Sequence, residues 1–171
     1  MNTDNSPVDF FLTKYSKQYD VSNFDCGEFK LNNYFKSNLI RRDVNLKLCT
    51  CYLAISKSSQ QVIAFYTITP TSLLKQDVNP KGKLSKVPYE SLPFLLIGRF
   101  AVDSKYKRKH IGTSLFASIV DNLIKMEEYV SFVGLVVDAK NDNLIDGFYN
   151  SLGFKRISPQ SKRLILLTPI S

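Results

Sequence analysis

The chain has 171 residues, 44% of them hydrophobic and 22% charged, a composition typical of one folded domain and not of a disordered or collagen-like chain. Its net charge of +8 indicates either an anionic partner such as nucleic acid or a lysine-rich surface that only keeps the protein in solution. The 3 cysteines argue against a disulfide framework, and the 1 histidine excludes a metal site built from several histidines.

The N-terminal stretch Met1–Val8 is polar and lacks the apolar centre of a signal peptide. No apolar run approaches the roughly 20 residues that are needed to span a bilayer. We therefore expect a cytoplasmic protein with no membrane partner and no metal.

The N-terminal part of the chain predicts a strand followed by a helix. Val8–Leu12 is a short apolar run typical of a strand. Asp25 and Glu28 have the spacing of a helix-capping pair, and apolar residues then recur at helical intervals over Leu31–Leu39. We expect one helix in this region.

A hairpin and a long connection come next. Leu48–Ile55 and Val62–Ile68 are apolar runs joined by a short polar turn, which predicts two antiparallel strands. Pro70–Pro93 is rich in proline and lysine, as long functional loops often are. It is interpreted as a basic insertion with a short helix near Thr71–Lys75.

The next segments predict a parallel pair of strands. Phe94–Val102 is almost continuously apolar, which is typical of a strand buried on both faces. An amphipathic helix follows over Gly112–Glu127, with its apolar side running from Leu115 to Ile124, and then a strand at Phe132–Val137. A strand, helix and strand in this order favour parallel pairing.

The C-terminal part predicts a short helix and a last strand. Asp142 or Asn143 is a candidate cap for a helix that runs to Leu152, and Gly153 stands where a glycine ends many helices. Leu164–Leu167 is the last apolar run. The whole pattern indicates a mixed α/β sheet.

A basic loop leads from the Phe94–Val102 strand into a helix at Gly112. The start of a helix has unpaired N–H groups and the positive end of the helix dipole, which together bind phosphate. Charges and hydroxyl groups around this point come from Lys107, Arg108, Lys109, Thr113 and Ser114. The pattern indicates an anion site, or else an ordinary solvated basic turn.

The stretch Leu96–Phe116 resembles the acetyl-CoA motif of GNAT acetyltransferases, a strand followed by Q/R-x-x-G-x-G/A. Gly112 matches the last position, whereas Lys107 replaces Gln or Arg and His110 replaces the first Gly. The resemblance implies that acetyl-CoA is the cosubstrate. The residues implied in its binding are Phe100, Ala101, Val102, Lys107, Arg108, Lys109, His110, Ile111, Gly112, Thr113 and Ser114.

A second stretch, Gly147–Phe154, is similar to the F-Y-x-x-x-G-F segment of the same family. The resemblance implies that Tyr149 is the general acid near the sulfur, and that a backbone N–H near Ala101 or Val102 stabilises the oxyanion. It also implies a GNAT fold over residues 1–171 as a single domain. That fold has a mixed, mostly antiparallel sheet with a splayed parallel pair at the acetyl-CoA site, flanked by helices.

A third set of stretches resembles GNAT toxins of type II toxin–antitoxin systems: Asn23–Gly27, Ile97–Asp103 and Leu164–Ile170. This resemblance implies acetylation of the amino group of an aminoacyl-tRNA, which blocks translation. It also implies a ribbon–helix–helix antitoxin as partner, and a homodimer. Asn141 and Asn143 are both candidates for the residue that starts the helix before Tyr149.

Several basic residues are candidate RNA contacts, which would give affinity without sequence selection. The main candidates are Arg41, Arg42, Arg99, Lys155 and Arg156, with Lys81, Lys83, Lys86, Lys162 and Arg163 as further ones. The same residues could equally form a solvated face. Arg99 stands in an apolar strand, where it contacts either an acidic ligand or an acidic side chain of the protein.

Two other functions fit the same residues. The chain could be a GNAT enzyme that acts on protein N-termini or small amines, although its positive charge disfavours polyamines. It could also be a non-catalytic GNAT-like binding module, because Lys107 and His110 depart from the family pattern. Binding of acetyl-CoA would separate that module from both enzymes.

Overall fold

A computed structural model describes residues 8–168, which form two compact units. The first unit comprises the described residues up to Ile68 together with Arg99–Met126, and the second comprises Thr69–Gly98 together with the described residues from Glu127 on. Met1–Pro7, as well as Pro169 and Ile170 of the C-terminal toxin-like stretch, lie outside the described residues.

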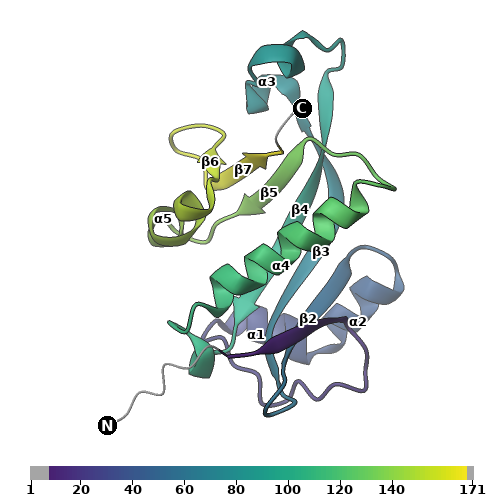
Figure 1. Cartoon of the computed structure of the whole chain (residues 1–171), viewed down its shortest axis with the longest axis vertical. Helices are drawn as coiled ribbons and strands as arrows, with labels where there is room; N and C mark the ends of the chain where they lie inside the picture. The colour runs from purple at the N-terminus through teal and green to yellow at the C-terminus, as the bar shows by residue number, and fades with distance from the viewer. Residues whose placement is uncertain (1–7, 169–171) are drawn as a thin grey trace. The chain divides into compact units, whose positions relative to one another are not determined.

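The described strands form one hydrogen-bonded sheet of seven strands in the order β1-β2-β3-β4-β5-β7-β6 (Figure 1). Their bounds are β1 Phe10–Lys14, β2 Thr50–Ser56, β3 Val62–Leu74, β4 Ser91–Val102, β5 Gly134–Asp138, β6 Lys155–Arg156 and β7 Arg163–Leu167. Strands β4 and β5 pair in parallel, whereas β1–β2, β2–β3, β5–β7 and β6–β7 are antiparallel. The predicted hairpin, the parallel pair and the mixed α/β sheet are therefore confirmed.

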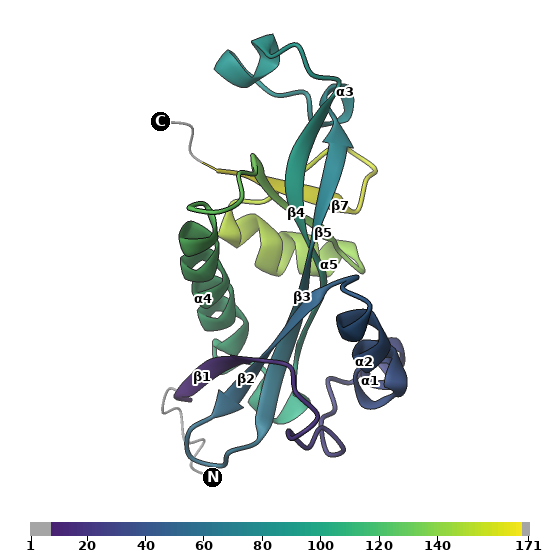
Figure 2. The ribbon, with the colours of Figure 1, turned by 90° about the vertical axis from the view of Figure 1, so that its right-hand side faces the viewer.

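In the first unit, helices cover both faces of the strands. Helix α4, Ile111–Met126, lies on one face, and α1, Phe29–Lys36, and α2, Asn38–Asn45, lie on the other (Figures 1 and 2). The prediction of one helix over Leu31–Leu39 is wrong, because Ser37 is extended with ψ of 178°. Its hydroxyl accepts the N–H of Leu39 at 3.2 Å and so caps a new helix.

An aromatic cluster forms the core of the first unit. Phe35 stacks on Phe65 with ring centroids 4.0 Å apart, and Phe24 meets Phe35 edge-on at 4.9 Å. All three rings are buried, and Ala101 of β4 packs in the same cluster. Burial of these rings fixes α1 and the segment before it against the sheet.

Helix α4 keeps most of its predicted inner face. Leu115, Phe116, Ile119 and Leu123 are buried. Ile124, which the spacing placed among the inward residues, is 61% exposed. The apolar stripe is thus narrower than the sequence indicates.

The second unit contains the proline-rich segment, which is folded rather than a long loop. Strand β3 continues to Leu74, helix α3 spans Lys75–Val78, and a 3₁₀ turn spans Gly82–Lys86. The predicted helix near Thr71–Lys75 is therefore displaced toward the C-terminus. Val78 and Leu84 are buried in a cluster with Phe94, and this contact holds the segment in place.

The other elements of the second unit follow β5. A helical stretch runs through α5, Asp142–Leu144, a π-helical turn, Ile145–Tyr149, and a 3₁₀ turn, Asn150–Leu152. Gly153 ends it with φ of 89°, as predicted from its place after the helix. Between residues 8 and 168, no helix combines the length and the apolarity that a bilayer span requires.

Candidate functional site

The turn between β4 and α4 is built around a buried carboxylate. Asp103 is 4% exposed. One of its oxygens accepts the N–H of Lys105 at 2.9 Å, and the other accepts the N–H of Asp25 at 3.0 Å. Its own N–H donates to the carbonyl of Ile63 in β3 at 2.8 Å. The turn is therefore fixed to the sheet and to the segment before α1.

The toxin-like segment Asn23–Gly27 is tied to this turn by further hydrogen bonds. The N–H of Ser104 donates to the carbonyl of Asp25 at 2.7 Å. The Asp25 carboxylate accepts the N–H of Gly27 at 2.8 Å and the amide of Asn32 at 2.6 Å, and these bonds hold the pKa of Asp25 below its ordinary value. Asp25 is thus not part of a capping box. The residue before α1 is Glu28, whose side chain makes no cap hydrogen bond.

Lys107 connects the same segment to the candidate acetyl-CoA loop. Its ammonium donates to the carbonyl of Cys26 at 2.6 Å. Gly27 has φ of 77°, a left-handed conformation that favours glycine, and a Cβ there would lie 3.4 Å from the Lys107 Nζ. The lysine at the Gln/Arg position of the motif therefore reaches back to the Asn23–Gly27 segment, a link that sequence spacing alone does not reveal.

The backbone of the loop adopts glycine-type conformations at residues that are not glycine. Arg108 has φ of 61° and His110 has φ of 57°. Such conformations cost roughly 1–2 kcal/mol for an ordinary residue. His110, at the first glycine position of the motif, thus has a left-handed backbone conformation in spite of its Cβ.

Helix α4 begins directly after this loop. The first hydrogen bond along it runs from the N–H of Ser114 to the carbonyl of His110 at 3.0 Å, so the N–H groups of Ile111, Gly112 and Thr113 precede the helical ladder. No acidic residue lies in the first turn. The first turn of α4 therefore carries no carboxylate of its own to compensate the positive end of the helix dipole.

The remaining residues of the predicted acetyl-CoA set lie on both sides of this turn. Ala101 and Ile111 are buried and serve as anchors. Phe100 and Val102 of β4 are half-buried, and Thr113 and Ser114 are exposed. Strand β4 pairs with β5 only over Leu95–Ile97, so the stretch of β4 that contains Phe100, Ala101 and Val102 extends beyond this pairing.

In the second unit, Asn141 begins the helical stretch that leads to Tyr149. Its side-chain oxygen accepts the N–H of Leu144 at 3.0 Å, and so it caps α5. The alternative caps, Asp142 and Asn143, are both wrong. Asn141 is thus the residue that caps this helical stretch.

Tyr149 ends the π-helical turn and is held by other rings. Phe148 lies edge-on to it with centroids 5.2 Å apart, and Phe154 lies edge-on at 5.6 Å. Burial raises the pKa of Tyr149 above its ordinary value, so its hydroxyl stays protonated at neutral pH. No hydrogen bond to this hydroxyl occurs within residues 8–168. The sequence analysis did not predict the π-helical turn, a type of turn that is frequent at functional sites.

Three of the ten basic residues proposed from the sequence as RNA contacts are bound to acidic side chains. Arg42 donates twice to Asp43, at 3.0 and 2.8 Å. Arg156 contacts Asp142 at 2.6 Å, and Arg163 donates to both oxygens of Asp138, at 2.8 Å each. The exposed residues Arg41 and Lys155 have no ion pair within residues 8–168.

The expectation that Arg99 pairs with an acidic side chain of the protein is not met. Its guanidinium lies over the ring of Tyr34, 3.4 Å from the centroid, a cation–π contact. The hydroxyl of Tyr34 donates to Asp43 at 3.0 Å. Among the described residues Arg99 has no direct ion pair with a carboxylate, although its charge helps to lower the pKa of Asp43. A paired acidic side chain is thus not found.

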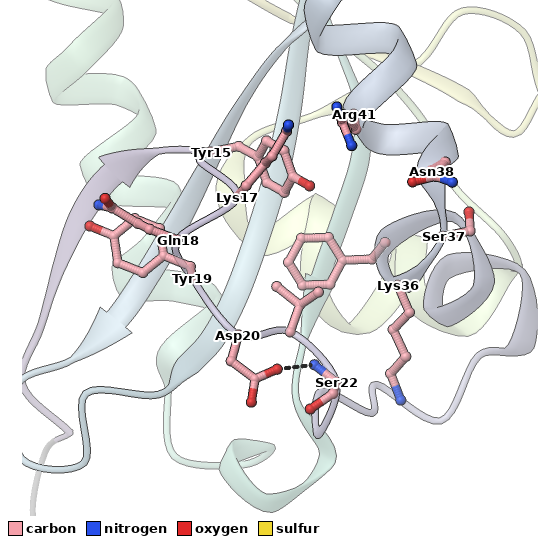
Figure 3. A pocket seen from close by; sticks show the side chains of 12 residues that line it. Tyr15, Lys17, Gln18, Tyr19, Asp20, Ser22, Lys36, Ser37, Asn38 and Arg41 are labelled. Carbon is pink, nitrogen blue, oxygen red and sulfur yellow. Dashed lines mark hydrogen bonds between the residues drawn. The ribbon is translucent and has the colours of Figure 1, made fainter.

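A polar hollow also occurs in the first unit, between the segment after β1 and the corner of α1 and α2 (Figure 3). Arg41 is its only member among the residues singled out from the sequence. The other residues come from two stretches, Tyr15–Ser22 and Phe35–Asn38, and the sequence analysis identified no motif that contains them. Among the described residues, no three His, Cys, Asp or Glu side chains gather into a candidate metal site.

Toxins occur both among the proteins similar to this chain in sequence and among those similar to it in structure. No family model matches the chain. A tRNA-acetylating toxin of Mycobacterium tuberculosis is 23% identical over 148 residues, which cover 86% of this chain and 85% of the toxin. The structure of AtaT complexed with acetyl-methionyl-tRNAfMet has a TM-score of 0.82 and 27% identity, over 94% of this chain and 95% of that one.

A further AtaT structure, a tyrosine-to-phenylalanine variant bound to acetyl-CoA and to the C-terminus of the antitoxin AtaR, has a TM-score of 0.72. It is 25% identical and covers 94% of both chains. The expected sheet, with one parallel pair and flanking helices, is the fold of these toxins. In fold, in length and in sequence, the chain therefore resembles the GNAT acetyltransferase toxins of toxin–antitoxin systems.

Proposed function

We propose that this chain is an N-acetyltransferase that moves the acetyl group of acetyl-CoA to the amino group of an aminoacyl-tRNA, and that residues 1–171 act as one domain. The observation that carries the proposal is the similarity to AtaT in complex with acetyl-methionyl-tRNAfMet over 94% of the chain. The net charge of the chain, +8, fits an RNA substrate.

The loop between β4 and α4 is the proposed site of the acetyl-CoA pyrophosphate. The N–H groups of Ile111, Gly112 and Thr113 and the dipole of α4 supply donors and positive potential. Side chains that add charge or hydroxyl groups are Lys107, Arg108, Lys109, His110, Thr113 and Ser114. The left-handed conformations at Arg108 and His110 support this assignment, because they are the ones that a glycine-rich phosphate loop uses.

The chemistry assigned to the chain is direct transfer. The amine attacks the thioester carbonyl, the C–S bond breaks, and the leaving thiolate takes a proton from Tyr149, while the amine loses its proton to water. A backbone N–H near Ala101 or Val102 would stabilise the oxyanion. An α-amino group has a pKa of roughly 7.7–8.0, so much of it is neutral near pH 7 and a strong base is not needed.

We rank the main candidate RNA contacts by whether their charge is already paired. Among them, Arg41 and Lys155 are exposed and carry no ion pair within the described residues, so we propose them as the leading contacts. Arg42 and Arg156 would have to share their guanidinium groups with Asp43 and Asp142. Arg99 is proposed to bind RNA from its position over Tyr34.

An antitoxin of the ribbon–helix–helix type and a homodimer complete the proposal. AtaT is bound to the C-terminus of the antitoxin AtaR in one of the similar structures, which supports an antitoxin partner for this chain.

One observation favours a second candidate function, a non-catalytic binding module: the Cβ of His110 stands where the motif has glycine.

The test is incubation of the protein with radiolabelled acetyl-CoA and total aminoacyl-tRNA, with deacylated tRNA as the control. Label on the aminoacyl-tRNA alone would support the proposal. Turnover only with peptides or small amines would replace it by an ordinary acetyltransferase. Binding of acetyl-CoA can be measured by calorimetry, and its absence would leave only the binding module.

A further inference from the structure

The hollow in the first unit has the size of a small-ligand site. It lies between the segment Tyr15–Ser22 and the corner of α1 and α2 (Figure 3). Its volume of about 470 Å³ falls within the roughly 300–1,000 Å³ of binding pockets. The backbone N–H of Tyr15 donates to the carbonyl of Cys51 at 2.9 Å, so this wall is attached to the sheet.

The ionisable side chains that line the hollow have a net positive charge. Its cations are Lys17, Lys36 and Arg41, against one carboxylate, Asp20. No hydrogen bond or ion pair of these three cations is found within residues 8–168, whereas Asp20 accepts the N–H of Ser22 at 2.9 Å. This bond is dashed in Figure 3. The contrast with the neighbouring Arg42, which is bound to Asp43, indicates that Arg41 is available to a ligand.

Aromatic side chains line the same hollow. Tyr15 and Tyr19 are half-buried, and the fully buried ring of Phe35 forms part of the wall. Burial raises the pKa of Tyr15, so its hydroxyl is protonated at neutral pH and can donate a hydrogen bond. In Figure 3 this hydroxyl and the guanidinium of Arg41 lie on the same side of the hollow.

We propose that this hollow binds one nucleotide of the RNA substrate, with the phosphate held by Arg41 and the hydroxyl of Tyr15. A guanidinium binds phosphate through paired N–H donors, and a neutral phenol adds a third. Lys17 and Lys36 supply further positive potential, and Tyr19 offers a ring face to a base. The inference rests on the proposed function, because it assigns a place to the RNA of that reaction.

The experiment measures the affinity of deacylated tRNA for the full chain by fluorescence anisotropy over a range of salt concentrations. The variants are Arg41→Gln and Tyr15→Phe. The control is Lys30→Gln, a charge loss at an exposed residue of α1 that does not line the hollow. Thermal unfolding of each variant excludes a folding defect.

We expect Arg41→Gln to weaken binding about tenfold and to lower the slope of log K against log salt by about one, as the loss of one phosphate contact does. Tyr15→Phe should weaken binding about threefold with an unchanged slope, because it removes a neutral donor. The Lys30→Gln control should match the unaltered chain in both quantities.

Unchanged affinity and slope in both variants, with acetylation of aminoacyl-tRNA intact in the unaltered chain, would overturn the assignment of the hollow but not the proposed function. Failure of the unaltered chain to acetylate aminoacyl-tRNA would instead overturn the proposed function. If both variants lose binding of the purified antitoxin while their tRNA affinity is unchanged, the hollow takes an acidic protein segment and the nucleotide assignment is wrong.

Discussion

Two regions with proposed roles in acetyl transfer are held in place by different forces. The loop between β4 and α4 is tied by hydrogen bonds through Asp103, Asp25 and Lys107 to the segment before α1. The π-helical turn that ends at Tyr149 is held by the rings of Phe148 and Phe154. The first region is rich in directional polar contacts, and the second depends on packing.

The difference matches what each region is proposed to do. A loop with left-handed residues other than glycine persists only where its surroundings hold it, and the hydrogen bonds of Asp103 and Lys107 do so. A proton donor needs a hydroxyl that the protein has not already used. Ring packing orients Tyr149 without engaging its O–H, so that the proton is available for transfer.

Replacement of Tyr149 by Phe tests the second region and has the largest expected effect. The ring and its packing remain, and only the proton donor is lost. We expect kcat for acetyl transfer to fall about 100-fold, equivalent to about 2.7 kcal/mol, with little change in the affinity for acetyl-CoA. Single-turnover kinetics and calorimetry measure the two quantities. Tyr129→Phe, at an exposed tyrosine, is the control, and an undiminished kcat would remove Tyr149 from the reaction.

The substitution Asp103→Asn tests the carboxylate that holds the loop between β4 and α4. An amide has one acceptor oxygen, and its NH₂ group would face one of the two N–H donors of Asp25 and Lys105. We expect the free energy of unfolding in urea to fall by about 2 kcal/mol. Asp121→Asn on the exposed side of α4 should change it little. A loss below about 0.5 kcal/mol would show that the carboxylate does not fix the turn.

Lys107→Met removes the link to Cys26 while keeping the length of the side chain. Because the lysine is exposed, we expect the binding free energy of acetyl-CoA to weaken by only about 1 kcal/mol. This would be measured as a roughly fivefold rise in the KM for acetyl-CoA at nearly constant kcat. Hydrogen exchange at the Gly27 amide should also become faster. Lys105→Met, a charge loss in the same turn, is the control. If Lys107→Met and Lys105→Met have equal KM values, and hydrogen exchange at the Gly27 amide is unchanged in both, Lys107 does not have a positioning role.

His110→Gly has the smallest expected effect and the opposite sign. Glycine relieves the left-handed backbone, worth roughly 1–2 kcal/mol, but adds freedom to the unfolded chain, which costs about 0.5–1 kcal/mol. We expect the free energy of unfolding to rise by about 0.5 kcal/mol, measured in urea. Lys109→Gly, at a neighbour without positive φ, should lower it. A clear loss of stability in His110→Gly would mean that the imidazole makes a stabilising contact.

Local patterns in the sequence were sufficient for most elements. Apolar periodicity and turn residues act over a few neighbouring residues. They predict the hairpin, the parallel pair of strands, helix α4 and the glycine that ends the helical stretch, Gly153. The single helix expected over Leu31–Leu39 failed because the Ser37 hydroxyl caps a second helix. The folded proline-rich segment was missed because Val78 and Leu84 pack on residues distant in sequence.

The sequence by itself determined the positive charge and the resemblance of Leu96–Phe116 and Gly147–Phe154 to the GNAT motifs, because these are properties of residue types and short spacings. Only the tertiary structure decided which cations are free. Arg42, Arg156 and Arg163 contact carboxylates, and Lys107 donates to the carbonyl of Cys26, 81 residues earlier in the chain. Ion pairs and hydrogen bonds of this kind depend on distances of about 3 Å between side chains, which only the folded chain sets.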